Sequence, residues 1–193
     1  MQTFYMYFGL GWQHILNWQA YDHILFLAAL CGIYLISDWK KVLILVTAFT
    51  IGHSLTLALS VINVFTLSSN WIEFFIPLTI VATAGIHIAR KRTFNKKIDF
   101  TYLLTLFFGL IHGLGFSNYL KSLLGKNDNL IIQLFAFNLG IEIGQIVIVI
   151  LVLLTSFIVV SILRIQKREW HLFLSSVIFG IALMMAIQRY PCF

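Results

Sequence analysis

Six apolar stretches, each long enough to cross a lipid bilayer as a helix, take up most of this 193-residue chain. A membrane-spanning helix needs about 20 mainly apolar residues. On that rule the expected spans are residues 21–37, 42–63, 71–90, 99–121, 130–160 and 171–189. Only 10% of the residues are charged, whereas a soluble domain carries about 25%. The sequence therefore predicts an all-α, polytopic transmembrane helix bundle and excludes a water-soluble fold.

Two segments depart from a simple row of spans. Residues 130–160 are longer than one crossing requires, so we expect this helix to tilt, kink or project from the bilayer. Residues 1–18 are rich in aromatic side chains, which favour the membrane boundary, and predict an extra interfacial or re-entrant helix. No linker divides the chain, so we expect 1–193 to form a single transmembrane domain.

The basic residues are distributed unevenly between the two sides of the predicted bundle. Ten follow the first, third and fifth spans: Lys40, Lys41, Arg90, Lys91, Arg92, Lys96, Lys97, Arg164, Lys167 and Arg168. Three lie on the other side: Lys121, Lys126 and Arg189. By the positive-inside rule this asymmetry predicts a multi-pass protein of the bacterial inner membrane with both termini outside. Because the charge lies in these short segments, the net charge of +6 does not indicate a nucleic-acid partner.

Several ionisable residues lie within or at the mouth of the apolar stretches: His23, His53, His112 and Glu142. A charged group at the bilayer centre costs roughly 2.5–3.5 kcal/mol on insertion scales, so such residues usually face a site and not lipid. At a rise of about 1.5 Å per residue, the last three fall near mid-membrane. Imidazole and carboxylate are typical ligands of Zn²⁺ and Ni²⁺. The sequence therefore predicts a buried polar site that binds a divalent metal.

Helical spacing groups further polar residues with this site. Asn138, Glu142 and Gln145 are spaced i, i+4 and i+7, which predicts one polar stripe on their helix. Ser54 follows His53, and glycines flank both His112 and Glu142. Since small residues let membrane helices approach closely, we expect the helices that carry these residues to pack together.

Other polar residues allow two interpretations each. Asp22 and Glu73 open their spans on the outer side, where they either guide an ion inward or are simply solvated. His14 either extends this entrance or lies among the lipid headgroups. His87 lies beside Arg90 near the cytoplasmic end of its span, and we expect it to make a structural polar contact.

Five motifs resemble those of the HupE/UreJ family, the hydrogenase and urease accessory membrane proteins. They are His14-Ile-Leu-Asn-Trp-Gln-Ala-Tyr-Asp22-His23, Phe49-Thr-Ile-Gly-His53-Ser-Leu, Ile72-Glu73, His112-Gly-Leu-Gly-Phe116 and Phe137-Asn138-Leu-Gly-Ile-Glu142-Ile-Gly-Gln145. The family is regarded as nickel permeases that serve nickel enzymes. The resemblance implies that Asp22, His23, His53, His112 and Glu142 handle the metal. It further implies that Ser54, Glu73, Asn138 and Gln145 support the metal or its pathway, and that His14 belongs with them.

Three functions follow from these features. The main hypothesis is a permease for a divalent transition metal, nickel before zinc, in contact with the bilayer and with either a second copy or a metalloenzyme-maturation partner. Since protons compete with metal for imidazole, its uptake should fall below about pH 6. The alternative is a zinc-dependent intramembrane hydrolase, with His23, His53 and His112 as ligands and Glu142 as general base. The third is a noncatalytic accessory or sensor protein whose polar network only sets helix packing.

Overall fold

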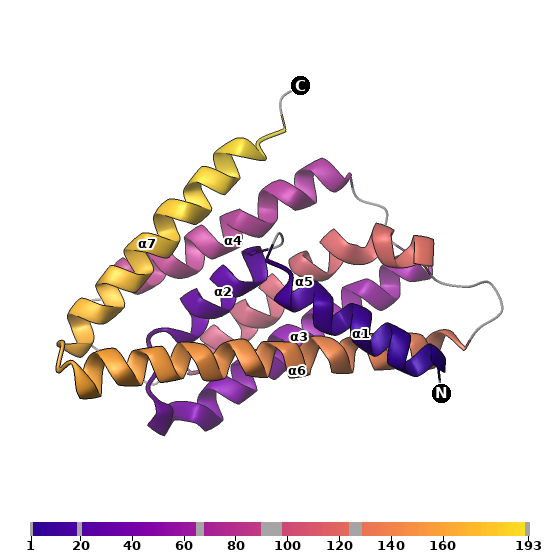
Figure 1. The fold of residues 1–193 in the computed structure, drawn as a ribbon. Helices are drawn as coiled ribbons and strands as arrows, with labels where there is room; N and C mark the ends of the chain where they lie inside the picture. Colours follow the sequence, from indigo (N-terminus) through magenta and orange to yellow (C-terminus); the bar gives the residue numbers. More distant parts are fainter. Residues whose placement is uncertain (1, 19–20, 65–67, 90–97, 124–128, 192–193) are drawn as a thin grey trace.

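The structure, a computed structural model, describes residues 2–18, 21–64, 68–89, 98–123 and 129–191. These residues form helices joined by short connections, with no strand among them. The helices are α1 (Gln2–Leu16), α2 (Asp22–Cys31), α3 (Trp39–Val61), α4 (Ser69–Ala89), α5 (Ile98–Leu123), α6 (Leu130–Phe157) and α7 (Lys167–Gln188). A 3₁₀ turn at Ile36–Asp38 precedes α3, and a π-helical turn at Ile158–Ile162 extends α6. The predicted all-α bundle is confirmed (Figure 1).

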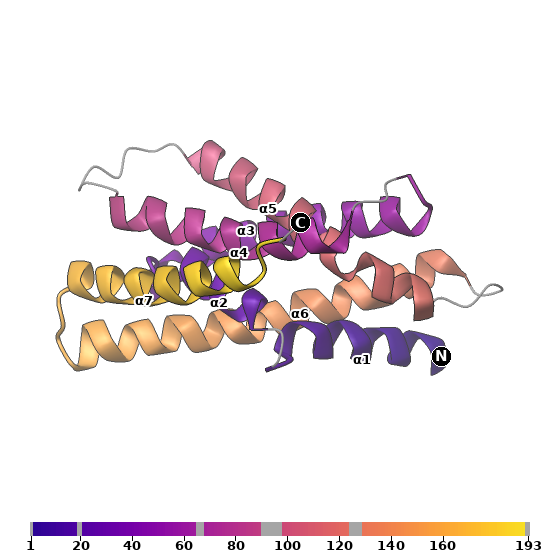
Figure 2. The same cartoon turned by 90° about the horizontal axis from the view of Figure 1, so that it is seen from above.

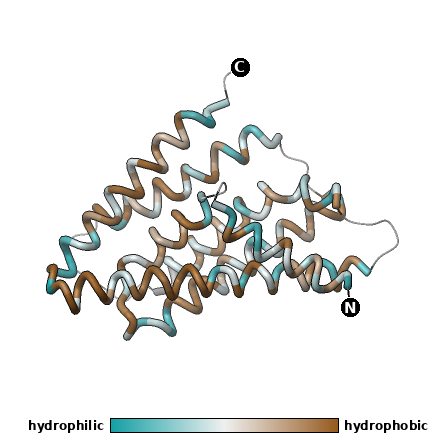
Figure 3. Tube along the Cα trace, in the orientation of Figure 1, coloured by the Kyte–Doolittle hydropathy of each residue, from teal (hydrophilic) through white to brown (hydrophobic). Residues whose placement is uncertain are grey.

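Four of the helices have the length and apolar character of membrane spans. They cover Ile36–Val61, Ser69–Ala89, Leu130–Ile162 and Lys167–Gln188, and correspond to the second, third, fifth and sixth expected spans. The fourth expected span is α5, whose apolar part is the shorter segment Thr101–Ser117. Long hydrophobic stretches run along α6 and α7 (Figure 3). Leu151 and Ile187 on these helices are 57% and 62% exposed, as expected for side chains that face lipid. The chain is a membrane protein.

The first expected span is shorter in the structure than the sequence predicted. Residues 21–37 are helical only over Asp22–Cys31, after which the chain turns at Gly32 and enters the 3₁₀ turn that leads into α3. Helix α1 packs lengthwise against the first half of α6, and α2 follows it along the second half (Figures 1 and 2). Together α1 and α2 form one interrupted helix, and Trp18 and Tyr21 beside its break are 86% and 40% exposed.

Two pairs of parallel helices approach closely through glycine. In the first pair, Gly52 of α3 lies against the backbone of Leu106, and Gly109 of α5 lies against the backbone of Phe49. In the second pair, Gly11 of α1 lies against the backbone of α6. A Cβ atom at any of these three positions would overlap a backbone atom of the partner helix. Small residues therefore fix the close packing of α3 with α5 and of α1 with α6.

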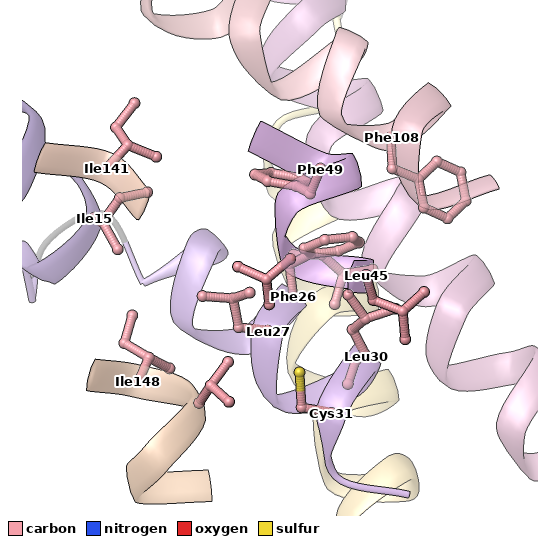
Figure 4. Close-up of a cluster of buried hydrophobic side chains, with 14 of the residues drawn as sticks. Ile15, Phe26, Leu27, Leu30, Cys31, Leu45, Phe49, Phe108, Ile141 and Ile148 are labelled. Atoms are coloured by element: carbon pink, nitrogen blue, oxygen red, sulfur yellow. The ribbon is translucent and has the colours of Figure 1, made fainter. Parts of the chain in front are cut away.

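Helix α2 lies at the centre of the apolar core. It packs against α4, α6 and α7, and the ring of Phe26 lies 4.8 Å from that of Phe49 on α3 and 6.1 Å from that of Phe108 on α5. Figure 4 shows side chains of this core, among them Leu27, Leu30 and Cys31 of α2. Because α2 is surrounded in this way, its first turn, which carries Asp22 and His23, lies inside the protein.

Part of the predicted asymmetry of basic residues between the two ends of the bundle can be located in the structure. The start of α3, with Lys40 and Lys41, and the turn between α6 and α7, with Arg164 and Lys167, lie at the same end of the bundle (Figure 1). The basic residues at 90–97 and Lys126 lie outside the described residues.

Candidate metal site

Three histidines from three helices meet at the break between α1 and α2. His14 lies in the last turn of α1, His23 in the first turn of α2, and His53 within α3. One ligand nitrogen from each can be chosen so that all three lie within 4.8 Å of one another. The ring of His14 is 4.6 Å from that of His23 and 6.0 Å from that of His53, measured between centroids. We call these three residues the histidine cluster.

Each residue of the histidine cluster has a ring nitrogen that lacks a hydrogen-bond partner among the described residues. Within the described part of the chain, Nε2 of His14, Nε2 of His23 and both ring nitrogens of His53 are buried without one. His53 is completely buried and His23 is 4% exposed. A buried polar atom left unpaired costs about 1–3 kcal/mol. Four such atoms at one place therefore fit a site that binds an imidazole-seeking ligand, such as a divalent transition metal.

The break in the helix supplies the electrostatic setting. Carbonyl groups at the C-terminal end of α1 favour a cation, whereas the N-terminal end of α2 disfavours one. Asp22, in the first turn of α2, offsets that unfavourable end with its negative charge. Interrupted membrane helices frame ion sites in this manner in transporters.

Asp22 connects His23 to the end of α7. Its Oδ1 lies 3.0 Å from Nδ1 of His23, and its Oδ2 lies 3.3 Å from Nη1 of Arg189. Oδ1 also accepts a hydrogen bond of 2.9 Å from the backbone N–H of His23. The nearby carboxylate would favour a proton on Nδ1, which would leave Nε2 of His23 free to bind a metal. The structure thus places Asp22 between His23 and Arg189, and its expected role as a metal ligand stays a prediction.

His112 lies beside the histidine cluster. Its ring centroid is 5.3 Å from that of His23, and its Nε2 is 3.1 Å from the hydroxyl oxygen of Thr79 on α4. The rings of Phe26 and Phe49 pack against it at 5.1 and 5.2 Å. His112 thus reaches the site from α5 but is not one of the three residues whose ligand atoms converge.

Glu142 makes a different contact from the one we expected. Its Oε1 accepts a hydrogen bond of 3.1 Å from Thr47, and this pair lies on an exposed part of the α3–α6 interface. One turn further along, Gln145 accepts a buried hydrogen bond of 2.7 Å from Thr50. These two contacts join α3 to α6 and leave Glu142 outside the group of converging ligands.

The remaining predicted residues occupy separate positions. Glu73 is exposed near the start of α4, and Ser54 is half-buried beside His53. Asn138 is half-buried, and its side-chain oxygen has no hydrogen-bond partner among the described residues. The structure therefore brings His14, His23, His53, His112 and Asp22 together, and places Glu73 and Glu142 elsewhere.

Aromatic rings border the histidine cluster on the α5–α6 side. The ring of Phe116 lies 3.9 Å from His14 and stacks on Phe137 at 5.1 Å. These rings exclude water from one side of the cluster, which strengthens electrostatic interactions within it.

Comparison with protein families identifies the chain. The family model described as HupE / UreJ protein matches residues 1–189. The chain belongs to the HupE/UreJ family. The match extends beyond the motifs quoted above and includes α7 with Arg189. No curated protein and no solved structure gives a significant match. Membership of HupE/UreJ, together with the apolar helices, supports a metal-related accessory or permease role in a membrane.

Two features of the site were missed from the sequence. His14, which the sequence allowed either at the entrance or among the lipid headgroups, lies in the histidine cluster. Arg189 was counted only as an outer basic residue, yet it contacts Asp22 across 167 positions of the chain. This contact could not be predicted, because the sequence does not say which helices are neighbours.

Proposed function

We propose that the protein is a permease for a divalent transition-metal ion, with nickel as its cargo. Its site would consist of His14, His23 and His53. The observation that carries the proposal is the set of unpaired, buried imidazole nitrogens at the break in the α1–α2 helix. Imidazole suits nickel, copper and zinc, and family membership favours nickel among them.

The composition of the site suits a cargo that must be released. Three neutral imidazoles add no charge to the site, and the one carboxylate close by, Asp22, is shared between His23 and Arg189. A site of this kind holds a metal through few ligands and lets it go again. In the proposed orientation both termini are outside the cell, and the ion enters past Glu73 and moves toward the basic side.

The hydrolase alternative receives less support. It requires a general base close to a metal-bound water, and Glu142 was its candidate. Glu142 instead contacts Thr47 on the exposed part of the α3–α6 interface. The intramembrane hydrolase is therefore not the function that the geometry favours.

Titration calorimetry on the detergent-purified protein tests this proposal. We expect one nickel ion per chain at micromolar affinity, and a loss of at least tenfold in affinity for His53→Ala. His171→Ala is the control, because His171 lies in the first turns of α7, away from the histidine cluster. Absence of nickel binding by the wild type would contradict the proposal. If one zinc ion per chain stays bound in the presence of chelators, the site holds a permanent metal and not a transported one.

A further inference from the structure

A cavity lies between α2, α4 and α5, separate from the histidine cluster. Its polar lining consists of Thr83 and His87 of α4 and Thr101 and Thr105 of α5. Leu30 and Phe108 are among the apolar residues that close it. The volume of the cavity, measured for the centre of a water-sized sphere, is about 30 Å³. This is enough for one or two water molecules, or for a metal ion in their place.

A row of polar side chains joins this cavity to the metal site. Thr79, Thr83 and His87 are spaced i, i+4 and i+8, so they share one face of α4. Thr79 contacts His112 at the cluster end of this row, and Thr83 and His87 line the cavity at the other end. Phe108 of the lining is one helical turn from His112 along α5. The row therefore leads from the histidine cluster toward the end of α4 that precedes the basic residues.

The threonine hydroxyls along this route are able to accept a cation or its water. Thr79 donates to the carbonyl of Ile76 at 2.7 Å, Thr83 to that of Thr79 at 2.8 Å, and Thr105 to that of Thr101 at 2.8 Å. Since the hydroxyl protons of Thr83 and Thr105 are bonded within their own helices, the lone pairs of these two oxygens remain for a ligand, whereas the oxygen of Thr79 contacts His112. Among the described residues that line the cavity there is no carboxylate, so a divalent cation would be held weakly there.

We propose that this cavity is a second binding station for the transported cation, on the exit side of the histidine cluster. His87 provides its imidazole ligand, the hydroxyls of Thr83 and Thr105 bind the ion or its water, and His112 with Thr79 separates the two stations. This inference rests on the proposed permease function. It gives His87, which the sequence analysis treated as structural, a role in passage of the ion.

The test compares nickel binding with nickel flux in the same variants. His87→Ala and Thr83→Val remove the ligands of the second station. Their matched controls are His171→Ala and Thr155→Val, since Thr155 is exposed on α6 and bonds within its own helix as Thr83 does. We expect uptake into proteoliposomes to fall at least fivefold for the first two variants. Their nickel affinity at the histidine cluster should stay within twofold of the wild type.

Three results would overturn the inference. Unchanged uptake in both variants, with an active wild type, would show that the cavity is not on the route while leaving the permease function intact. A loss of affinity in proportion to the loss of uptake would mean that His87 and Thr83 only position the cluster. Absence of flux in the wild type would remove the permease function itself. If His87→Ala fails to fold, Thr83→Val and His87→Gln carry the same comparison.

Discussion

Arg189, at the end of α7, lies 3.3 Å from the carboxylate of Asp22, at the start of α2. The same carboxylate lies 3.0 Å from His23. The end of α7 therefore contacts the carboxylate that lies beside His23 of the histidine cluster. Because the Asp22 side chain is 10% exposed, loss of either partner would leave its charge poorly compensated.

Arg189→Gln should weaken nickel binding without removing a ligand. The loss of positive charge frees Asp22 to rotate away from His23, and disturbing an orienting partner typically lowers metal affinity about 10–100-fold. Titration calorimetry measures the change, and Arg189→Lys should restore part of the affinity. Arg168→Gln, a change at an exposed position near the start of α7, serves as the control. Equal affinities for Arg189→Gln and the wild type would refute the orienting role.

Asp22→Asn separates orientation from ligation. The amide keeps the size of the side chain but loses the negative charge that favours a proton on Nδ1 of His23. We expect affinity to fall about tenfold while nickel keeps its imidazole ligands in an X-ray absorption spectrum. A spectrum that loses an oxygen ligand in the variant would instead place Asp22 in the coordination sphere.

Gly52→Ala should destabilise the α3–α5 pair. An added Cβ would overlap the backbone at Leu106, and overpacking of this kind costs about 1–3 kcal/mol. The matched control is Gly180→Ala on α7, where a Cβ meets nothing within 4 Å and alanine favours the helix. Thermal melting in detergent should show a lower midpoint for the first variant and an equal or higher one for the second. Equal midpoints in the two variants would mean that α3 and α5 are packed less closely than described.

Thr50→Val tests the buried contact between α3 and α6. The substitution keeps the shape of the side chain and removes the 2.7 Å hydrogen bond to Gln145. Hydrogen bonds between membrane helices contribute about 0.6 kcal/mol on average, so the melting midpoint should fall slightly while nickel affinity is kept. A large loss of affinity would show instead that Thr50 and Gln145 take part in binding the ion.

Much of the fold was predictable from the sequence because hydrophobic length alone defines a membrane span. Helices α3, α4, α6 and α7 follow directly from this rule. The aromatic-rich segment 1–18 was expected to form an extra helix, and α1 confirms it. Its continuation into α2 as one interrupted helix was not predicted, since α2 has only ten residues and α1 is too short and aromatic to resemble a span. Its place in the bundle depends on contacts with α6, which are remote in sequence.

The site was predictable by residue type but not by partner. The cost of burying imidazole marked His23, His53 and His112 as functional residues, and the structure brings them close together. Their role as ligands stays a prediction. Depth along a helix placed Glu142 at the same level but could not give the direction of its side chain, which points to Thr47. The direction of a side chain around its helix axis is set by packing. Packing turns His14 into the histidine cluster and Glu142 toward Thr47.

Nickel flux into proteoliposomes that contain a trapped fluorescent chelator tests the central claim most directly. The account predicts rapid, saturable entry with the wild-type protein and at least a tenfold slower entry with His53→Ala, when both proteins elute as folded species on gel filtration. Entry no faster than in protein-free vesicles, or equal entry with the wild type and His53→Ala, would contradict it.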